Sequence, residues 1–383
     1  MSRFSSIWAT EIDHLRADTP RNPVLYFAPE TLAETHRRFR AGFAGEVTYA
    51  VKANDNPGVI ETLAQGGMRA FDVASPAEIA ALRALVPGAA LHYNNPVRGR
   101  DEIALAVEAG VTSYAVDGFG EFDKLCAQVP KGREMAVRLA LPVEGAAYHF
   151  GTKFGEGPDG AAALLRAVVA AGYTPAMTFH PGTQCEDPAA WTQYIETCAE
   201  VAQAAGVRLE RLNLGGGFPS DRGQGARLQP IFDAIEAAVT RAFPAHPPKL
   251  LCEPGRAMVA EAFTAAFRVK AERACGGLFL NDGIYGLLAE LPIMGPHHRL
   301  RVVSPEGVMR RGAPRPRVLY GPTCDSLDRL PDTVDLPDDV VEGDYVIFDG
   351  IGAYSTATNT RFNGYGAYDI VTVRRSGHRA LGG

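Results

Sequence analysis

Residues that can act as acids, bases or nucleophiles follow short apolar runs at several points of the chain. Lys52 lies in YAVKAN, Asp72 in FDVAS, His180 in FHPGTQ, and Glu253 begins EPGR. Lys52 is the most informative of these, because an ammonium group inside an apolar run is costly to bury without a partner. A desolvated lysine with a lowered pKa is what Schiff-base chemistry requires. We therefore expect Lys52 to be a buried, reactive amine.

A glycine-rich segment adds an anion site. Gly215, Gly216 and Gly217 are consecutive, so their backbone N–H groups can approach a phosphate, and Arg256 supplies a fixed cation. Taken singly, three glycines are usually a tight turn, a lone histidine is usually a core residue, and a lone aspartate usually caps a helix. Taken together, a lysine, a phosphate cradle, a histidine and a carboxylate are the parts needed to hold pyridoxal phosphate.

Eight apolar runs carry these residues, and each is short enough for a strand buried on both faces, as in parallel sheets. The runs are 47–54, 69–75, 90–95, 112–117, 135–142, 176–182, 211–217 and 249–255. Helical signals separate them, among them a capping box at Ser75–Glu78 and a helix that opens at Asp187-Pro188 and can close at Gly206.

This alternation predicts an α/β fold, a (β/α)8 TIM barrel. An open doubly wound sheet would ordinarily show fewer repeats and a GxGxxG segment after its first strand, which this chain lacks. Because the chemistry of such barrels lies at the carboxyl ends of the strands, we expect the polar residues there, Asn94, Asp117 and Arg138 among them, to meet at one mouth.

The residue pattern changes near residue 262, and this change marks a second domain. The runs beyond it are β-rich and are separated by Gly, Pro and Asp turns without strong helices. PVLYF, at 23–27, precedes the first barrel helix and can add a strand to this domain. We predict a cofactor-binding barrel over 28–262, and an all-β domain, a β-sandwich or β-barrel, made of 1–27 and 263–383.

The composition argues against some classes of binding partner. The 383 residues are 46% hydrophobic and 21% charged, with a net charge of -6, which is a globular balance without the basic runs that bind nucleic acid or anionic membranes. The six cysteines form no CxxC pair, so neither a disulfide framework nor a metal site is indicated, and most should be buried thiols. The amino-terminal segment has no apolar core of signal-peptide length, so we expect a cytoplasmic protein that binds a small molecule.

Seven motifs resemble, in order and spacing, those of the fold-type III pyridoxal-phosphate decarboxylases with the alanine racemase-like fold, and above all the eukaryotic-type ornithine decarboxylases. The motifs are YAVKAN (49–54), FDVAS (71–75), FHPGTQ (179–184), LGGGFP (214–219), EPGR (253–256), GPTCDSLD (321–328) and GAYSTATNTRFNG (352–364). The resemblance runs from about residue 20 to residue 370. It implies that the chain decarboxylates a basic L-amino acid of the ornithine or lysine type in polyamine biosynthesis.

The resemblance also implies a role for each matching residue. Lys52 would bind the cofactor covalently, His180 would stack on its ring, and Glu253 would hold the proton on its ring nitrogen. Asp72 and Arg138 would lie near the Lys52 linkage. The residues around the phosphate would be Thr183, Gly215, Gly216, Gly217, Arg256 and Tyr354. These roles suit the chemistry, because the α-carbanion left by loss of carbon dioxide needs a protonated ring to take its charge.

A homodimer with shared active sites is a further implication. Cys324 and Asp325 would come from the partner subunit. Cys324 would reprotonate the α-carbon, which a thiol with a tuned pKa can do, and Asp325 would bind the distal ammonium of the substrate.

Two departures from the family pattern bear on the substrate. Ornithine decarboxylases usually carry a second substrate-facing Asp about a dozen residues after DG-x-YG, but NDGIYG is followed here by LLAELPIMGPHH, in which Glu290 is the only acid. In HPGTQ, Pro181 removes a backbone donor beside His180, whereas Thr183 still offers a hydroxyl. The missing acid suggests another chain length, a larger amine or relaxed specificity.

Three alternatives stay open. A diaminopimelate or carboxynorspermidine-type decarboxylase shares the fold, although the diaminopimelate branch usually has CES where this chain has CDS. An alanine-racemase-like enzyme would be expected to place Arg, and not Glu253, opposite the ring nitrogen. A non-catalytic regulatory homologue is disfavoured because Lys52, Glu253, Arg256 and Cys324 are all retained.

Overall fold

The computed structural model describes residues 7–142, 147, 153–223, 225–295 and 297–374. The chain divides into two compact units. A barrel unit comprises 36–219 and 227–258, and a β unit comprises 1–35, 220–226 and 259–383. Helix α2 (Pro29–Gly42) begins in the β unit and ends in the barrel unit.

Among the residues described, nine strands make up the parallel sheet of the barrel unit. They are β2 (Glu46–Val47), β3 (Tyr49–Ala50), β4 (Ala70–Val73), β5 (Ala90–Tyr93), β6 (Ser113–Val116), β7 (Glu134–Arg138), β8 (Thr174–Thr178), β9 (Arg211–Asn213) and β10 (Lys249–Cys252). The sheet order is β2-β10-β9-β8-β7-β6-β5-β4-β3. All four residues of β4 and of β6 are buried, as expected of strands covered on both faces.

The first predicted strand is split, and the split closes the barrel. β2 pairs with β10, while β3, one residue further on, pairs with β4. Thr48 lies between them, and both its backbone N–H and its hydroxyl donate to the carbonyl of Cys252, at 2.9 and 3.0 Å. The same short segment therefore borders the last strand and the second, which confirms the predicted barrel.

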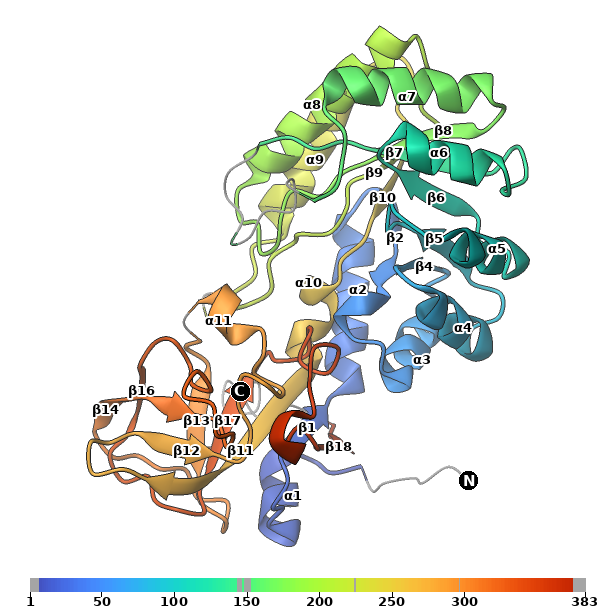
Figure 1. Cartoon of the computed structure of the whole chain (residues 1–383). Helices are drawn as coiled ribbons and strands as arrows, with labels where there is room; N and C mark the ends of the chain where they lie inside the picture. Colours follow the sequence, from blue (N-terminus) through green and yellow to red (C-terminus); the bar gives the residue numbers. More distant parts are fainter. Residues whose placement is uncertain (1–6, 143–146, 148–152, 224, 296, 375–383) are drawn as a thin grey trace. The chain divides into compact units, whose positions relative to one another are not determined.

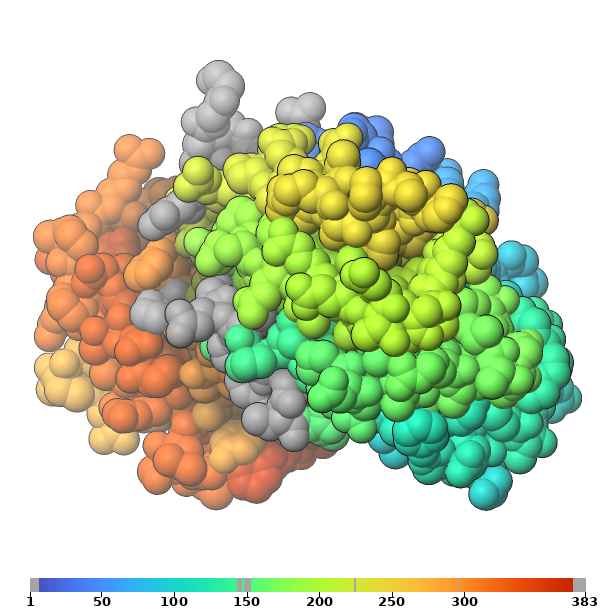
Figure 2. Space-filling model, turned by 90° about the horizontal axis from the view of Figure 1, so that it is seen from above, coloured from blue at the N-terminus to red at the C-terminus, as the bar shows by residue number. Residues whose placement is uncertain are grey.

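Helices cover the outside of this sheet (Figure 1). They are α3 (Pro57–Gln65), α4 (Pro76–Leu85), α5 (Arg100–Glu108), α6 (Phe119–Cys126), α7 (Pro158–Ala170), α8 (Pro188–Ala205), α9 (Gln229–Ala242) and the short α10 (Arg256–Val259). Figure 2 shows the green, lime-green and yellow surfaces of α7, α8 and α9 in adjacent bands, in agreement with the direct packing of α8 against both neighbours.

Two of the predicted helix boundaries can be checked directly. The Asp187 side chain caps α8 by accepting from the N–H of Ala189 at 2.9 Å, and Gly206 ends the helix with a φ of 66°. At α4, the Ser75 hydroxyl accepts from the N–H of Glu78, but the Glu78 carboxylate accepts from Ala74, one residue before the cap. The capping box is therefore only half formed.

The β unit is built on strands that are far apart in the sequence. Its main sheet contains β1 (Val24–Phe27), β11 (Phe263–Glu272), β12 (Leu278–Leu280), β13 (Leu300–Val303), β15 (Leu319–Tyr320), β17 (Tyr345–Asp349) and β18 (Asp369–Thr372). β1 pairs antiparallel with β11 and parallel with β18, so PVLYF joins this sheet as predicted.

The prediction omitted several short elements of the β unit. They are helices α1 (Glu11–Asp18) and α11 (Leu291–Met294), the 3-10 turns at Ala260–Ala262 and Phe362–Gly364, strand β12, and the two-stranded pair β14 (Pro314–Arg317) and β16 (Val334–Pro337). In β14 the sequence PRPR has three exposed residues and no apolar alternation, so it offered no strand signal.

Two further observations concern composition. Cys185, Cys198 and Cys252 are buried free thiols and Cys126 is partly buried, whereas Cys275 and Cys324 are exposed, so the expectation of buried thiols holds for some of the cysteines and not for all. Among the residues with described positions, no helix is both long enough and apolar enough to cross a membrane.

Candidate active site

The predicted residues of the barrel unit all lie at or just beyond the carboxyl ends of its strands. The positions are Lys52 in the 3-10 turn Val51–Ala53 after β3, Asp72 within β4, Arg138 at the end of β7, His180 and Thr183 after β8, Gly215–Gly217 after β9, Glu253 directly after β10, and Arg256 at the start of α10. Parallel strands bring these ends to one side of the barrel.

Lys52 and Asp72 form an ion pair. The Lys52 Nζ lies 3.1 Å from Asp72 Oδ2. The side chain of Asp72 is 1% exposed, but that of Lys52 is 41% exposed, so the expectation of a buried lysine is wrong. The strand ends at Ala50, and Lys52 lies in the 3-10 turn that follows it. The other carboxylate oxygen of Asp72, Oδ1, is buried and has no hydrogen-bond partner among the residues described.

Glu253 is a buried carboxylate with two amide donors. The side-chain amides of Asn94, after β5, and Asn213, at the end of β9, both donate to its Oε1. Burial and the nearby charge of Asp72 raise the pKa of Glu253 to about 8, against the opposing effects of Lys52, Asn213 and Arg138. The carboxyl group therefore keeps its proton near neutral pH unless a cation joins it.

His180 is held as a neutral imidazole. Burial, together with the charges of Arg138 and Lys52, keeps its pKa well below the usual value. Its Nδ1 accepts from the backbone N–H of Gly182 at 3.1 Å, so Nε2 is the protonated nitrogen. Gly182 thus supplies the backbone donor that Pro181 cannot.

Arg138, at the end of β7, is a half-buried cation of the group. Burial lowers the pKa of Arg138, and the negative charges of Glu253, Asp117 and Asp72 oppose that effect. Its guanidinium carbon lies 5.3 Å from the ring centre of Phe154.

The glycine segment is closely surrounded by backbone. A Cβ atom added to Gly215 would lie 2.1 Å from the carbonyl oxygen of Phe179, and one added to Gly217 would lie 2.3 Å from that of Gly182. Both glycines have positive φ, 65° and 86°. Only glycine fits these two positions, so bare backbone lines this part of the site.

Arg256 and Thr183 meet beside this segment. Nε of Arg256 donates to the hydroxyl of Thr183 at 3.3 Å. A guanidinium, a hydroxyl and bare glycine backbone are the groups that bind a phosphate. This part of the barrel is therefore suited to an anion.

The predicted residues of the β unit form a separate group. Cys324 is exposed, and its N–H donates to Asn363 Oδ1 at 3.0 Å. Asp325 Oδ1 accepts from the N–H of Leu327 at 2.9 Å, and Oδ2 accepts from the hydroxyl of Tyr285. The bond from Tyr285 lowers the pKa of Asp325, so this carboxylate is ionised and suited to a cation.

The other two predicted residues of this unit, Glu290 and Tyr354, lie on different segments. Glu290 immediately precedes the short helix α11. Tyr354 has a φ of 58°, an uncommon conformation for a residue with a side chain.

Three residues that contact or interact with the predicted site residues were not expected from the sequence. Asn213 precedes the glycine segment by two positions, and Tyr285 lies inside NDGIYG. Both residues are therefore in or next to motifs that the sequence already singled out. Glu78 was interpreted only as a helix cap, yet burial raises its pKa to about 7, and its charge interacts with those of Asp72 and Lys52.

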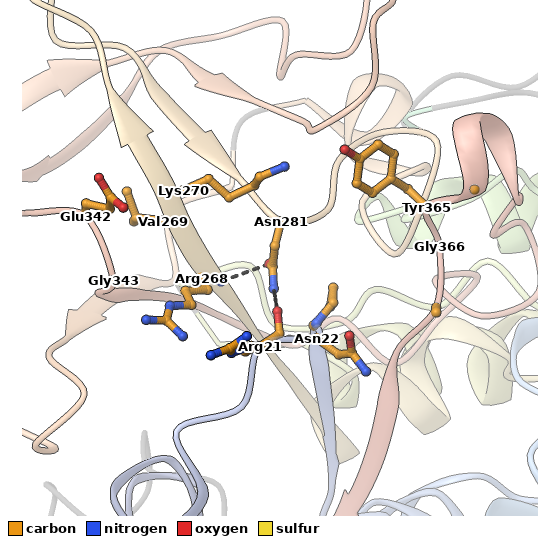
Figure 3. Close-up of a pocket in the computed structure, with 13 residues that line it drawn as sticks. Arg21, Asn22, Arg268, Val269, Lys270, Asn281, Glu342, Gly343, Tyr365 and Gly366 are labelled. Atoms are coloured by element: carbon orange, nitrogen blue, oxygen red, sulfur yellow. Dashed lines mark hydrogen bonds between the residues drawn. The ribbon is translucent and has the colours of Figure 1, made fainter.

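A pocket of about 640 Å³ lies within the β unit and contains none of the predicted site residues. Its lining includes the cations Arg21, Arg268 and Lys270 and the acid Glu342. Figure 3 shows the side chain of Asn281 between the backbones of Arg21 and Arg268, where it accepts from the N–H of Arg268 at 2.9 Å and donates to the carbonyl of Arg21 at 2.8 Å.

Comparison with known proteins agrees with this geometry. Residues 30–260 match a family model described as the pyridoxal binding domain of pyridoxal-dependent decarboxylases. The chain is 30% identical to ornithine decarboxylase of Mus musculus over 352 residues, which are 85% of this chain and 74% of the relative. It is 32% identical to lysine/ornithine decarboxylase of Selenomonas ruminantium (83% and 81% covered) and 30% identical to antizyme inhibitor 2 of Xenopus laevis (83% and 73% covered).

A solved structure extends the similarity to the whole fold. The arginine decarboxylase of Paramecium bursaria Chlorella virus superposes with a TM-score of 0.86 at 25% sequence identity, covering 94% of this chain and 98% of the viral one.

The glycine segment generates a first prediction. Gly217→Ala should weaken binding of pyridoxal phosphate at least about tenfold, because the new methyl group would displace the carbonyl of Gly182 and force a positive φ on alanine. The measurement is a spectrophotometric titration with pyridoxal phosphate. Gly120→Ala, in α6 with open space around the added methyl, is the matched control. Equal affinity in both variants would contradict the role of the glycine segment.

The buried carboxyl group generates a second prediction. The pKa of Glu253 rises from 4.5 to about 8 on folding, so between these values the folded chain binds more protons than the unfolded one. The free energy of unfolding of the cofactor-free protein should therefore fall as pH rises through this window. Glu253→Gln has no proton to lose, so its Tm should exceed that of the wild type by a margin that grows from pH 5 to pH 8.

The control for this measurement is Glu61→Gln, which removes an exposed carboxyl group from α3. A Tm difference between Glu253→Gln and wild type that stays constant with pH would contradict the inferred titration.

Proposed function

The chain belongs to the pyridoxal-dependent decarboxylase family, and from this premise we propose that it decarboxylates a basic L-amino acid of the ornithine or lysine type to the corresponding diamine. Family membership confirms the resemblance found in the sequence, the enzyme class and pyridoxal phosphate as the cofactor. The observation that carries the proposal is the grouping of Lys52, Asp72, Glu253 and His180 at the carboxyl ends of the barrel strands.

The residues present fit this cofactor. The Lys52 amine is accessible, the glycine segment and the Thr183–Arg256 pair suit its phosphate, and Glu253 offers a carboxylate. The unpartnered Oδ1 of Asp72 is a buried acceptor that a bound group can satisfy. When bound, pyridoxal phosphate supplies the electron sink for the carbon that loses carbon dioxide.

The ionisable groups of the site have different roles. Asp72, 3.1 Å from the Lys52 amine, stabilises positive charge at that nitrogen while the amine is attached or exchanged. Glu253 keeps a proton on a ring nitrogen, because a buried carboxylate binds a cation far more strongly than water does. His180, being neutral, offers a flat ring without competing for the negative charge of Glu253.

We assign the remaining steps to the β unit. Cys324, an exposed thiol, delivers the proton that replaces carbon dioxide, and Asp325 binds the distal ammonium of the substrate. In this proposal both act in the site of the partner subunit of a homodimer. The Tyr285 hydroxyl orients Asp325 by donating to it.

The substrate within the basic class follows from the acids available. The segment after NDGIYG offers Glu290 and no Asp, so one carboxylate, Asp325, is the main ligand for the distal ammonium. The relatives include ornithine, lysine/ornithine and arginine decarboxylases. We favour ornithine or lysine, whose compact ammonium groups suit a single carboxylate. The diaminopimelate and carboxynorspermidine types are the catalytic alternatives.

Because one relative is an antizyme inhibitor, a non-catalytic regulatory homologue stays an alternative. Here the lysine, its aspartate partner, the phosphate cradle and the thiol are all present together. This full set favours an enzyme. The cytoplasmic location expected from the sequence stays a prediction.

Carbon dioxide release tests the proposed function. Purified protein with pyridoxal phosphate should release carbon dioxide from L-ornithine or L-lysine faster than from L-arginine, meso-diaminopimelate or carboxynorspermidine. Asp325→Asn should raise KM about tenfold or more with a smaller change in kcat, because a charge-assisted bond is lost. Asp335→Asn, on an exposed position of β16, is its control.

The same assay separates the alternatives. Preferential turnover of diaminopimelate or carboxynorspermidine would replace the proposed substrate class. Absence of release from every substrate, by protein that binds the cofactor, would support the regulatory homologue. Lys52→Ala, which removes the amine that binds the cofactor, should lack both turnover and the visible absorbance that borohydride removes from wild type.

Shared active sites generate a further prediction. Lys52→Ala and Cys324→Ala chains are each expected to lose most amine production, but equal mixing after dissociation should restore about a quarter of wild-type activity through hybrid dimers. Each hybrid has one site in which both residues are intact. The measurement is amine production before and after mixing, and no recovery would count against the two-chain site.

A further inference from the structure

Side chains from three strand ends of the barrel meet at one oxygen atom; β9 and β10 are adjacent in the sheet, but β5 is adjacent to neither. Asn94 follows β5, Asn213 ends β9, and Glu253 follows β10, and both side-chain amides donate to Glu253 Oε1. All three side chains are buried. No other hydrogen bond to this carboxylate is found in the part of the chain that the structure describes. Oε1 is therefore occupied twice, and Oε2 is left for another group.

The orientation of the two amides is determined by their surroundings. Asn213 Oδ1 accepts from the backbone N–H of Gly215 at 3.0 Å, and since an N–H can only donate, Nδ2 of Asn213 must be the atom that faces Glu253. In Asn94, turning the amide would bring Oδ1 against a carboxylate oxygen, which is repulsive. Oδ1 of Asn94 is buried and unbonded among the residues described, and the bond from Nδ2 to Glu253 offsets that cost.

We propose that Asn94 and Asn213 are positioning residues that hold Glu253 as a carboxylate and leave its Oε2 as the oxygen that bonds the ring nitrogen of the cofactor. This inference rests on the proposed function, because it requires bound pyridoxal phosphate. Asn213 has a second effect, since the same side chain fixes Gly215 in the phosphate-binding segment. One residue thus links the two ends of the cofactor site.

The electrostatics around Glu253 explain why such donors are needed. The groups whose charges act on it are Asp72 from β4, Lys52 from the turn after β3, and Arg138 from β7, while His180 from the loop after β8 is neutral. Burial and Asp72 oppose ionisation. Hydrogen bonds to the charged form favour it, and donors held by buried strand ends need no rearrangement to do so.

The consequence concerns where one proton lies. With both amides donating, Glu253 is the weaker base and the proton stays on the ring nitrogen. With one donor removed, Glu253 becomes a stronger base by about one pKa unit and draws the proton away, which leaves a neutral ring that is a poorer electron sink.

Nitrogen NMR of the bound cofactor tests this inference. Holoenzyme is prepared with pyridoxal phosphate labelled with ¹⁵N in the ring, and the ¹⁵N chemical shift reports whether that nitrogen carries a proton. We expect a protonated shift in wild type, and in Asn94→Ala a move toward the neutral value equivalent to about a tenfold change in the ratio of the two forms. The rate of carbon dioxide release should fall in parallel.

Two further variants keep the test decisive. Asn94→Leu keeps the γ-branched outline of the side chain, at a larger volume and without a donor, so it should shift in the same direction even if the alanine variant packs poorly. Asn95→Ala is the control, because the neighbouring amide donates to the carbonyl of Ala74 and not to Glu253. Its shift should equal that of wild type.

The outcomes separate the two proposals. If wild type binds the cofactor and both Asn94 variants keep the wild-type shift, the role of the amides is overturned while the proposed function stands. If wild type takes up no labelled cofactor, the proposed function fails and this inference fails with it. A shift in the Asn95 variant as large as in the Asn94 variants would show that the effect is not specific to the donors on Oε1.

Discussion

Closure of the barrel by residues 46–50 is the constraint on which the site depends. Because β2 pairs with β10 and β3 pairs with β4, the turn that carries Lys52 lies between the strand that carries Asp72 and the one that precedes Glu253. The contact is close, since a methyl group on Gly255 would lie 3.0 Å from Ala53 Cβ. Without this closure, Glu253 would lie at the opposite edge of an open sheet from Lys52 and Asp72.

Because barrel closure brings these ionisable groups close together, their charges affect one another. Two buried carboxylates, Asp72 and Glu253, lie near the cations Lys52 and Arg138, so each charge depends on the others. The two carboxylates have different hydrogen-bond partners. Asp72 is paired with an ammonium group, whereas Glu253 accepts from two neutral amides, which stabilise its charge without adding a positive charge beside it. This difference lets two similar acids carry out different tasks.

The sequence was sufficient for the fold and for the residues at the strand ends, because parallel strands and their helices have strong periodic signals. The sequence was insufficient for features that depend on tertiary contacts. The split of the first strand depends on pairing with β10, and the exposure of Lys52 depends on the turn after Ala50. Asn213 had no signal of its own, since an amide before a glycine segment is unremarkable until its partner is known. Short exposed strands such as β14 lack any apolar pattern.

The pairing of β1 has a consequence for synthesis of the chain. Val24–Phe27 leave the ribosome before any strand of the barrel, yet their partners are Phe263–Ala266 and Asp369–Thr372. Every barrel strand is therefore available for folding before β1 finds its first neighbour, and the main sheet of the β unit can be completed only after β18 has been synthesised. During that interval both hydrogen-bonding edges of an apolar strand lack their native partners. Vectorial synthesis thus favours barrel-first assembly, with premature pairing of β1 as its main hazard.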